Sequence, residues 1–300
     1  MRVAVAQIEP KLGEAESNLD LCLRMLDEAA ADGCSLLVLP ECSSAGYVFE
    51  SPEEALAHAQ EIPGPFTEAL AAACGRLDVV CVAGMLEREG DALRNTAVVA
   101  GPDGLLGRYR KTHLPYLGVD RFVTPGDELE VVDTPAGRIG VEICYDLRFP
   151  ELTRALALDG AEIVVLPTNW PVEARANADV LTRARAYENR VFLLVANRVG
   201  RERDAEFCGW SQICNVRGER LVEAGQAEEA LLVAEIDVGE AREKDIVPSP
   251  GRYEMALFGH RRPDLYGSLV ERPDTQRATR VAGRSAVSWE AGEAGHSLTT

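Results

Sequence analysis

The sequence predicts an α/β fold with a mixed β-sheet. Between residues 1 and 266, short apolar runs rich in Val, Ile and Leu alternate with longer segments of helical periodicity, the pattern of strands covered by helices. Turn sequences at 101–104 (GPDG) and 216–219 (VRGE) join apolar runs directly and predict hairpins. Because helical crossovers join parallel strands and hairpins join antiparallel strands, the sheet is expected to be mixed. With 46% hydrophobic residues, the chain of 300 residues can bury a large core.

The individual elements follow from these patterns in order along the chain. The first helix is expected to begin at the cap residues Ser17 and Asn18 and to end at Gly33. Pro150 opens a later helix, since a first-turn residue needs no N–H donor. Strands are predicted at residues 3–7, 35–39, 79–83, 95–100, 140–144, 163–166, 192–196, 212–215 and 231–236. Helices are predicted at residues 18–31, 65–74, 150–158 and 178–189.

Charge and composition exclude several classes of protein. Lys and Arg number 31 against 49 Asp and Glu, and the net charge of −18 argues against non-specific binding to nucleic acid or anionic lipid. No apolar run approaches the ~18 residues of a membrane span, and the first apolar segment is too short for a signal peptide. The eight cysteines form no CxxC pair, so we expect neither a zinc site nor a disulfide framework. A reducing, cytoplasmic location is therefore predicted.

The C-terminal segment differs in composition from the rest of the chain. Residues 271–300 mix Arg, Ala, Gly, Ser and Thr with few large apolar residues. Such a stretch cannot bury a core of its own. It is either a solvated or loosely docked tail, or an arm that clasps a second subunit.

Cys144 is the candidate nucleophile. An apolar strand ends at this cysteine, a turn follows, and Pro150 opens a helix. A thiol in that position projects into a crevice beside the backbone N–H groups of the turn, where α/β proteins place nucleophiles. The alternative reading of Cys144 is a buried small hydrophobe. Because a cysteine nucleophile needs a base, His113 and His260 are considered as partners, each of them alternatively an ordinary loop histidine.

Two other strand ends carry charged side chains. Glu41 follows the apolar run 36–39 and Pro40, and Lys111 ends a hairpin strand. These residues and Cys144 are too far apart in sequence for a local motif, so they meet only if the strand ends converge at one edge of the sheet. Taken singly, Lys111 is alternatively a solvated cation and Glu41 a carboxylate at a helix start.

Together these segments resemble the nitrilase, or carbon–nitrogen hydrolase, superfamily, in which a Glu-Lys-Cys set occurs in this order. The similarity rests on LPE at 39–41, RKTHL at 110–114 and ICYDLRFPE at 143–151. Five further segments are similar: ECSSAGY at 41–47, PTNW at 167–170, RARAYEN at 183–189, FCGWS at 207–211 and RRPDLY at 261–266. The resemblance implies one domain over residues 1–268 and leaves 269–300 as a tail.

The resemblance also implies an architecture and a reaction. The fold would be a four-layer α-β-β-α sandwich with two mixed β-sheets, assembled as a homodimer or higher homo-oligomer. Cys144 would attack an amide carbonyl while Glu41 takes the thiol proton and later activates the hydrolytic water. Lys111 and the backbone N–H of Tyr145 would stabilise the oxyanion. No metal or organic cofactor is implied, since these residues supply acid, base, nucleophile and electrophile.

Supporting residues also follow from the resemblance. Many members of the family carry a second Glu between the Lys and the Cys, where this chain has Asp120. Asp120 either orients Lys111 or the substrate, or is an ordinary loop carboxylate. Asn169 and Trp170 are expected to line the pocket, with Tyr47 opposite.

The residues after the cysteine narrow the substrate class. True nitrilases commonly have Trp-Glu there, whereas Tyr145 and Asp146 resemble the amidase, carbamoylase and ω-amidase branches. We therefore predict a small amide substrate, with an N-carbamoyl compound as the first alternative and a nitrile as the second. Arg148 either contacts a substrate carboxylate or pairs with Glu151. A catalytically silent binding protein is the alternative from another class, and the presence of Glu, Lys and Cys together argues against it.

Overall fold

The computed structural model describes residues 1–271. Residues Met1–Gly259 form one compact unit. The described part of the second unit, which starts at His260, contains two turns of 3-10 helix, Pro263–Leu265 and Gly267–Leu269. Apart from its first residues, the predicted tail 269–300 lies outside the described residues.

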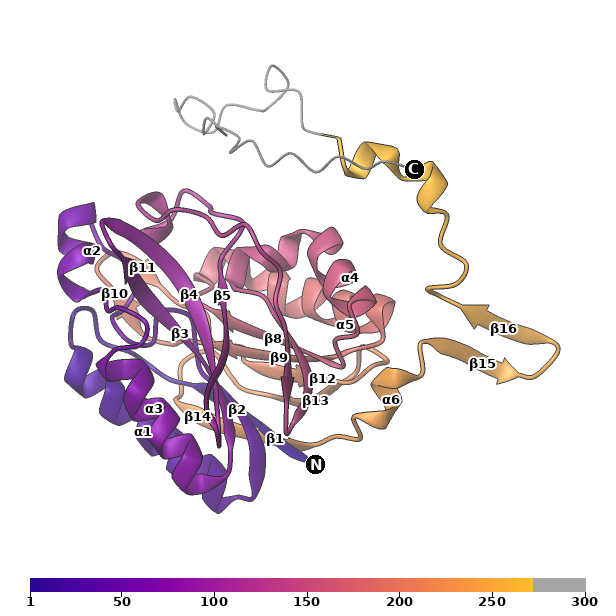
Figure 1. Cartoon of the computed structure of the whole chain (residues 1–300), viewed down its shortest axis with the longest axis horizontal. Helices are drawn as coiled ribbons and strands as arrows, with labels where there is room; N and C mark the ends of the chain where they lie inside the picture. Colours follow the sequence, from indigo (N-terminus) through magenta and orange to yellow (C-terminus); the bar gives the residue numbers. More distant parts are fainter. Residues whose placement is uncertain (272–300) are drawn as a thin grey trace. The chain divides into compact units, whose positions relative to one another are not determined.

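The first sheet of the unit Met1–Gly259 has the strand order β14-β1-β2-β3-β4-β5 (Figure 1). The β1–β2 and β2–β3 pairs are parallel, and the other pairs are antiparallel. The strands of this sheet are β1 (Arg2–Gln7), β2 (Cys34–Val38), β3 (Val80–Glu89), β4 (Ala92–Gly101), β5 (Gly104–Arg110) and β14 (Ala230–Glu235).

The second sheet has the order β13-β12-β9-β8-β7-β6. Its central strands β7, β8 and β9 are parallel, and antiparallel strands flank them on both sides. The strands are β6 (Val131–Thr134), β7 (Gly137–Val141), β8 (Ile163–Thr168), β9 (Phe192–Asn197), β12 (Gln212–Cys214) and β13 (Arg220–Glu223). Both sheets are therefore mixed.

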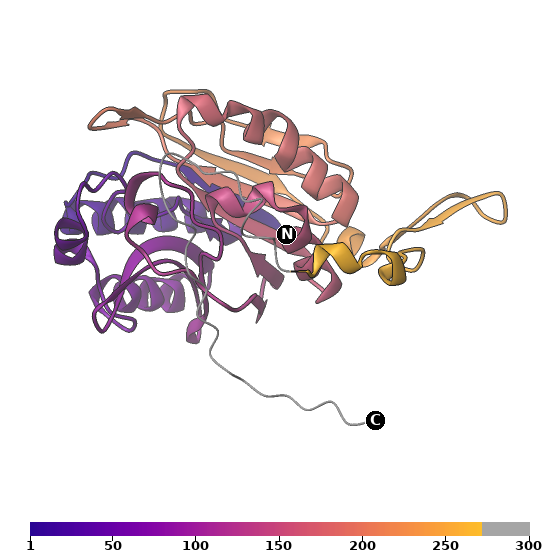
Figure 2. The same cartoon turned by 90° about the horizontal axis from the view of Figure 1, so that it is seen from above.

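Helices cover the outer face of each sheet (Figure 2). The helices α1 (Ala15–Ala31) and α3 (Pro65–Leu77) pack on the first sheet, and α4 (Pro150–Leu158) and α5 (Thr182–Asn189) pack on the second. The other α-helices and strands of this unit are α2 (Pro52–His58), α6 (Gly239–Arg242), β10 (Arg201–Glu202) with β11 (Ala205–Glu206), and β15 (Asp245–Ser249) with β16 (Tyr253–Ala256). Short 3-10 and π-helical turns lie between them.

Alternating side chains of the inner strands enter two different cores. On β1, Val3 and Val5 lie in the core that includes the facing residues of the second sheet, whereas Ala4 and Ala6 pack with α1 and α3. A strand buried on both faces needs apolar residues at every position, which explains its continuous apolar run. The layers follow as helix, sheet, sheet, helix, and the predicted four-layer α-β-β-α sandwich with two mixed sheets is confirmed.

The predicted start of the first helix is wrong. Helix α1 begins at Ala15, before the expected cap residues Ser17 and Asn18. The Asn18 side chain instead forms hydrogen bonds with the backbone N–H (2.7 Å) and carbonyl (2.8 Å) of Lys11. Asn18 therefore ties the helix to the preceding loop, and its polar side chain is used in a tertiary contact rather than in a cap.

The hairpins predicted at 101–104 and 216–219 are confirmed. Gly101 pairs with Gly104 at the β4–β5 turn, and residues 216–219 connect β12 to β13. The predicted helix 178–189 is interrupted, because Asn177–Leu181 form a π-helical turn before α5 begins.

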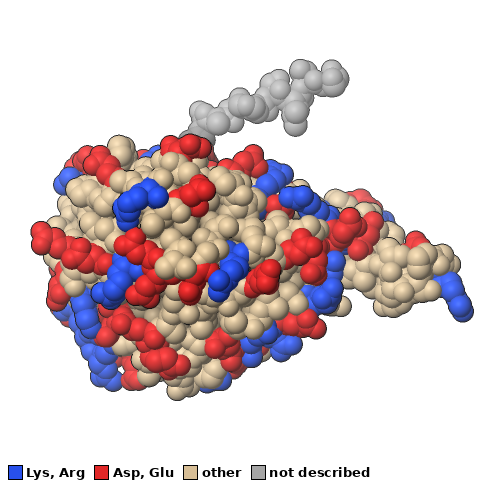
Figure 3. Space-filling model, turned by 90° about the horizontal axis from the view of Figure 1, so that it is seen from below, with Lys and Arg blue, Asp and Glu red and all other residues tan. Residues whose placement is uncertain are grey.

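Charged side chains of both signs are interspersed on the surface. On the face of the described residues drawn in Figure 3, acidic and basic groups alternate without a continuous basic patch. The described residues include no helix with the length and hydropathy that a membrane crossing requires.

Glu142 is a buried carboxylic acid between the second sheet and its helices. It directly follows β7, its N–H donates to the carbonyl of Val165 (3.0 Å), and its side chain is inaccessible to solvent. Neither carboxyl oxygen has a hydrogen-bond partner among residues 1–271. Burial raises the pKa of Glu142 to about 8, so the folded protein binds this proton more tightly than the unfolded chain does.

We expect Glu142→Gln to stabilise the protein increasingly as pH rises. Between the unfolded pKa near 4.5 and the folded value near 8, the Glu142 carboxyl group is protonated in the folded state and ionised in the unfolded state. The free energy of unfolding therefore falls as pH rises. The glutamine amide does not ionise, so the variant does not lose this stability. The difference in unfolding free energy between the variant and the parent protein should grow by about 1 kcal/mol per pH unit in that range. Denaturant titrations from pH 5 to 9 measure it, with the exposed Glu16→Gln as control. A gap independent of pH would contradict the prediction.

Candidate active site

Glu41 lies in the turn that follows β2. This turn is packed against β3 at Gly84, whose N–H donates to the carbonyl of Pro40 (3.1 Å). A Cβ atom on Gly84 would lie 2.5 Å from the Cα of Glu41, so the close approach requires glycine. The next residue, Cys42, has a φ of +50°, a left-handed conformation that few residues other than glycine adopt. The position of Glu41 is thus fixed by contact with β3.

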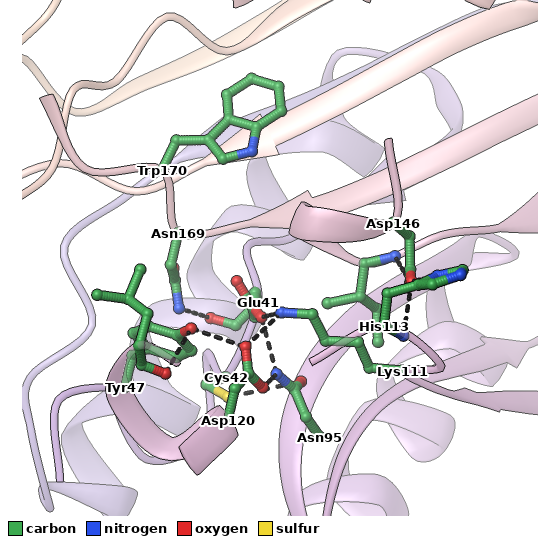
Figure 4. Close-up of polar contacts among 12 residues, drawn as sticks. Glu41, Cys42, Tyr47, Asn95, Lys111, His113, Asp120, Asp146, Asn169 and Trp170 are labelled. Atoms are coloured by element: carbon green, nitrogen blue, oxygen red, sulfur yellow. Dashed lines mark hydrogen bonds and ion pairs between the residues drawn. The ribbon is translucent and has the colours of Figure 1, made fainter. Parts of the chain in front are cut away.

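Lys111 lies directly after β5 and joins two carboxylates. Its N–H donates to the carbonyl of Asn95 (2.8 Å), which continues the pairing with β4. Its Nζ donates to Glu41 Oε1 (2.7 Å) and to Asp120 Oδ2 (2.5 Å), and all three side chains are shielded from solvent (Figure 4). Burial raises the pKa of Glu41, against the opposing effect of the Lys111 charge. Burial acts to lower the pKa of Lys111, but Asp120 and Glu41 together raise it well above its ordinary value.

Asp120 lies in the 3-10 turn Gly118–Arg121, and its carboxylate accepts two further hydrogen bonds. Its Oδ2 accepts from Tyr47 Oη (2.7 Å), and its Oδ1 accepts from Asn95 Nδ2 (2.8 Å). Gly118 has a φ of +50°, and a Cβ atom there would lie 2.3 Å from the Tyr47 ring. The geometry therefore makes Asp120 part of the buried cluster around Lys111.

Cys144 is the first residue of a 3-10 turn, Cys144–Arg148, rather than the last residue of a strand. Strand β7 ends at Val141, and Cys144 has a φ of +49°. Such a conformation costs a non-glycine residue on the order of 1–3 kcal/mol and is found most often at functional sites. The thiol is 5% exposed. Burial raises the pKa of Cys144, the Glu41 charge raises it further, and the Lys111 charge lowers it. The three predicted groups thus share one electrostatic environment.

Asp146 connects the Cys144 turn to the Lys111 segment. Its carboxylate accepts from the N–H of Ile143 (2.9 Å), the N–H of His113 (3.1 Å) and the hydroxyl of Tyr109 (2.9 Å). His113 Nδ1 lies 2.7 Å from Asp146 Oδ1, and its ring stacks on Phe149 with 3.7 Å between centroids. His113 therefore holds the turn in place through Asp146.

The remaining predicted residues lie in different surroundings. Asn169 follows β8 and donates to the backbone carbonyl of Glu41 (2.9 Å), while its Oδ1 has no partner among the described residues. Trp170 is 1% exposed and packs in the core. Tyr145 is half-buried, and its ring contacts the Phe149 ring edge-on with 5.2 Å between the ring centroids.

A cavity of about 610 Å³ opens beside Tyr47. Its walls come from the loop before Asp120, from the β10–β11 hairpin and from the segment after Trp170. Neither Asn169 nor Trp170 lines this cavity, in contrast to Tyr47. The lining residues with charged side chains are Glu50, Arg121, Glu173, Arg201, Arg203, Asp204 and Glu206.

The sequence reasoning missed Asn95. Its amide donates to Glu41 Oε1 (2.7 Å) as well as to Asp120, and it lies 1% exposed on β4 (Figure 4). The available signal was the alternation along the strand, which places Asn95 on the same face as the apolar residues Leu93 and Ala97. A buried amide in that position requires hydrogen-bond partners.

We expect Gly84→Ala to displace the Glu41 turn and to destabilise the protein. The new Cβ would overlap backbone atoms of Glu41, Pro40 and Cys42, which cannot move independently of β3. Overpacking of this kind costs about 1–3 kcal/mol. Thermal unfolding measures the loss, with Gly90→Ala at the tip of the β3–β4 hairpin as control. A Cβ atom on Gly90 would have no other atom within 4 Å. Gly90→Ala therefore loses stability only through the unfavourable backbone conformation of an alanine at a φ of +60°. Equal effects of the two substitutions would refute the steric argument.

Comparisons with known proteins place this arrangement in a family. The sequence profile of the carbon–nitrogen hydrolase family matches residues 2–245. A nitrilase of Pyrococcus abyssi is 40% identical over 248 residues, covering 82% of this chain and 93% of the relative. The omega-amidase NIT2 of Homo sapiens is 32% identical over 285 residues, covering 91% and 99% of the two chains.

Solved structures of amidases are also similar to this chain. The NitN amidase from Nesterenkonia sp. AN1 superposes with a TM-score of 0.75 and 26% identity, over 90% of this chain and 100% of that chain. A variant of the Nesterenkonia amidase, with the acetamide moiety of fluoroacetamide added covalently at its active-site cysteine, gives a TM-score of 0.70 at 27% identity, over 80% and 92% of the chains. The family profile spans both sheets and all three of Glu41, Lys111 and Cys144, and the chain belongs to the carbon–nitrogen hydrolase family of the nitrilase superfamily.

Proposed function

We propose that this enzyme hydrolyses the C–N bond of a small amide to a carboxylic acid and ammonia through a thioester on Cys144. The observation that carries the proposal is the buried cluster in which Lys111 binds two carboxylates while Glu41 Oε2 has no partner among the described residues. A carboxylate with one free oxygen and a raised pKa is suited to accept and return a proton. The covalent adduct on the Nesterenkonia amidase cysteine supports the same chemistry here.

The first half of the reaction forms the thioester. Glu41 accepts the thiol proton as the sulfur of Cys144 bonds to the amide carbonyl carbon. The carbonyl oxygen becomes an oxyanion, which the Lys111 ammonium and the Tyr145 N–H stabilise. The intermediate collapses as the C–N bond breaks, and Glu41 gives its proton to the leaving nitrogen, which departs as ammonia.

The second half hydrolyses the thioester. Glu41 is again ionised and takes a proton from water, whose oxygen bonds to the acyl carbon. The C–S bond then breaks, and Glu41 returns the proton to the sulfur, so that the carboxylic acid leaves and the resting state is restored. Asp120 keeps Lys111 charged and in place throughout. His113 is bound to Asp146 and stacked on Phe149, so we assign proton transfer to the carboxylate and not to a Cys/His pair.

The cavity beside Tyr47, whose lining includes none of Glu41, Lys111 and Cys144, offers no free arginine to a charged acyl group. Each arginine of its lining is already engaged: Arg121 donates to the carbonyls of Gly118 and Phe49, Arg201 pairs with Glu206, and Arg203 pairs with Glu50 and Glu54. A substrate carboxylate would have to displace one of these contacts. A neutral small amide is therefore favoured over the ω-amide of a dicarboxylate, with N-carbamoyl compounds as the next class to examine.

We also propose a homo-oligomer in the cytoplasm. Leu158 of α4, Val180 of the π-helical turn before α5 and Tyr187 of α5 are 42%, 60% and 56% exposed, and a second copy would cover them. All eight cysteines are free, which suits a reducing compartment.

Ammonia release over a substrate panel tests the proposal. We expect turnover of small neutral amides, weaker turnover of ω-amides of dicarboxylates and carbamoyl compounds, and little of nitriles. Cys144→Ala should abolish release, whereas Cys214→Ala, a buried cysteine of β12, should retain it. Turnover by the Cys144→Ala variant, or the absence of turnover with every substrate, would reject the proposal.

Lys111→Ala should lose at least about two orders of magnitude in kcat/KM, because one oxyanion donor is typically worth ~2.7–4 kcal/mol of barrier. The fold should survive, as judged by circular dichroism, but with lower stability, because Glu41 and Asp120 lose their buried cation. Lys11→Ala, which removes an exposed lysine paired with Glu9, is the control. Near-normal turnover of the Lys111 variant would exclude its assigned role.

A further inference from the structure

Asn95 contacts both carboxylates of the buried cluster. Its Nδ2 donates one hydrogen to Glu41 Oε1 (2.7 Å) and the other to Asp120 Oδ1 (2.8 Å) (Figure 4). Its Oδ1 lies 3.7 Å from Cys42 Sγ, which acts as a weak donor. The opposite amide orientation would direct Oδ1 at two carboxylates, so the chemistry of the neighbours fixes this side chain.

The charges of the cluster explain why a neutral donor is needed there. Glu41 and Asp120 bring two negative charges, and Lys111 brings one positive charge, all out of contact with water. A buried charge that lacks partners is costly. Tyr47 contributes a further donor, but only to Asp120, whereas Asn95 contributes one to each carboxylate.

The two oxygens of Glu41 are consequently unequal. Oε1 accepts from both Lys111 and Asn95, and Oε2 has no partner among residues 1–271. With both donors on one oxygen, the carboxylate cannot rotate without losing two hydrogen bonds, and Oε2 remains as the proton acceptor.

We propose that Asn95 is a positioning residue for Glu41, which orients the carboxylate so that Oε2 receives the proton and which favours its ionised form. This role rests on the proposed function of Glu41 as the base. The titratable groups that face Glu41 from the surrounding elements are Lys111, Asp120, Cys42 and Cys144, with Tyr47 behind Asp120.

The consequence is a displacement of the pH profile. Hydrogen bonds to an ionised carboxylate lower its pKa, so loss of the Asn95 donor must raise the pKa of Glu41. Glu41 would then be protonated, and inactive as a base, at pH values where the parent enzyme works. The acid limb of kcat/KM should move to higher pH, by about half a unit or more, and kcat should fall about tenfold or more with a smaller change in KM.

The experiment compares Asn95→Leu and Asn95→Ala with Thr96→Val. The first two substitutions remove the same donors but differ in volume, so a packing effect would separate them. Thr96 is the next residue of β4, is also buried, and donates to a different carboxylate, Glu87 Oε2 (2.6 Å), so its loss reports a general cost of removing such a bond. The pH profiles of amide turnover and of Cys144 alkylation by iodoacetamide are measured for all four proteins.

We expect both Asn95 variants to show the displaced acid limb in turnover and in alkylation, and Thr96→Val to keep the parent profile. Variants that lose activity without any displacement of the limb would show a purely structural role and overturn the inference. If the parent hydrolyses no amide, the proposed function fails, but alkylation of Cys144 still tests the effect of Asn95 on Glu41. If either Asn95 variant does not fold, the other one decides.

Discussion

The site depends on one ammonium group that is buried between two carboxylates. Taking three charges out of water is costly, and the arrangement is stable only when each charge has close partners. Lys111 satisfies this condition with Glu41 and Asp120 at 2.7 and 2.5 Å, and the neutral donors Asn95 and Tyr47 supply the rest. The same contacts that make the cluster stable also fix the base and keep the lysine charged.

The packing of the two sheets sets the distance between Glu41, the proposed base, and Cys144, the proposed nucleophile. Glu41 and Lys111 follow strands of the first sheet, whereas Cys144 follows β7 of the second. The core between the sheets contains side chains that precede each of these residues, such as Val38 before Glu41 and Ile143 before Cys144. A change in this core would therefore move the thiol relative to the carboxylate without altering either residue.

Contacts between separate segments of the chain fix the positions of the loops that carry Glu41, Asp120 and Cys144. Gly84 permits the Glu41 turn to lie on β3, Gly118 permits the Asp120 loop to lie on Tyr47, and Asp146 ties the strained Cys144 turn to the lysine segment. These fixed positions suit the proton transfer that we propose for Glu41.

The sequence by itself determined the alternation of strands and helices and the two tight hairpins, because these depend on local periodicity and turn chemistry. It also predicted Glu41, Lys111 and Cys144 as site residues, from segments that resemble a known family. It did not predict the bridging position of Asn95 or the role of Asp146 in holding the Cys144 turn. Those depend on contacts between residues far apart in the chain, and the position of Asp120 beside Lys111 depends on such contacts as well. Only the tertiary structure brought these groups together, since hydrogen bonds of buried side chains are decided by the packing of strands and not by neighbours in sequence.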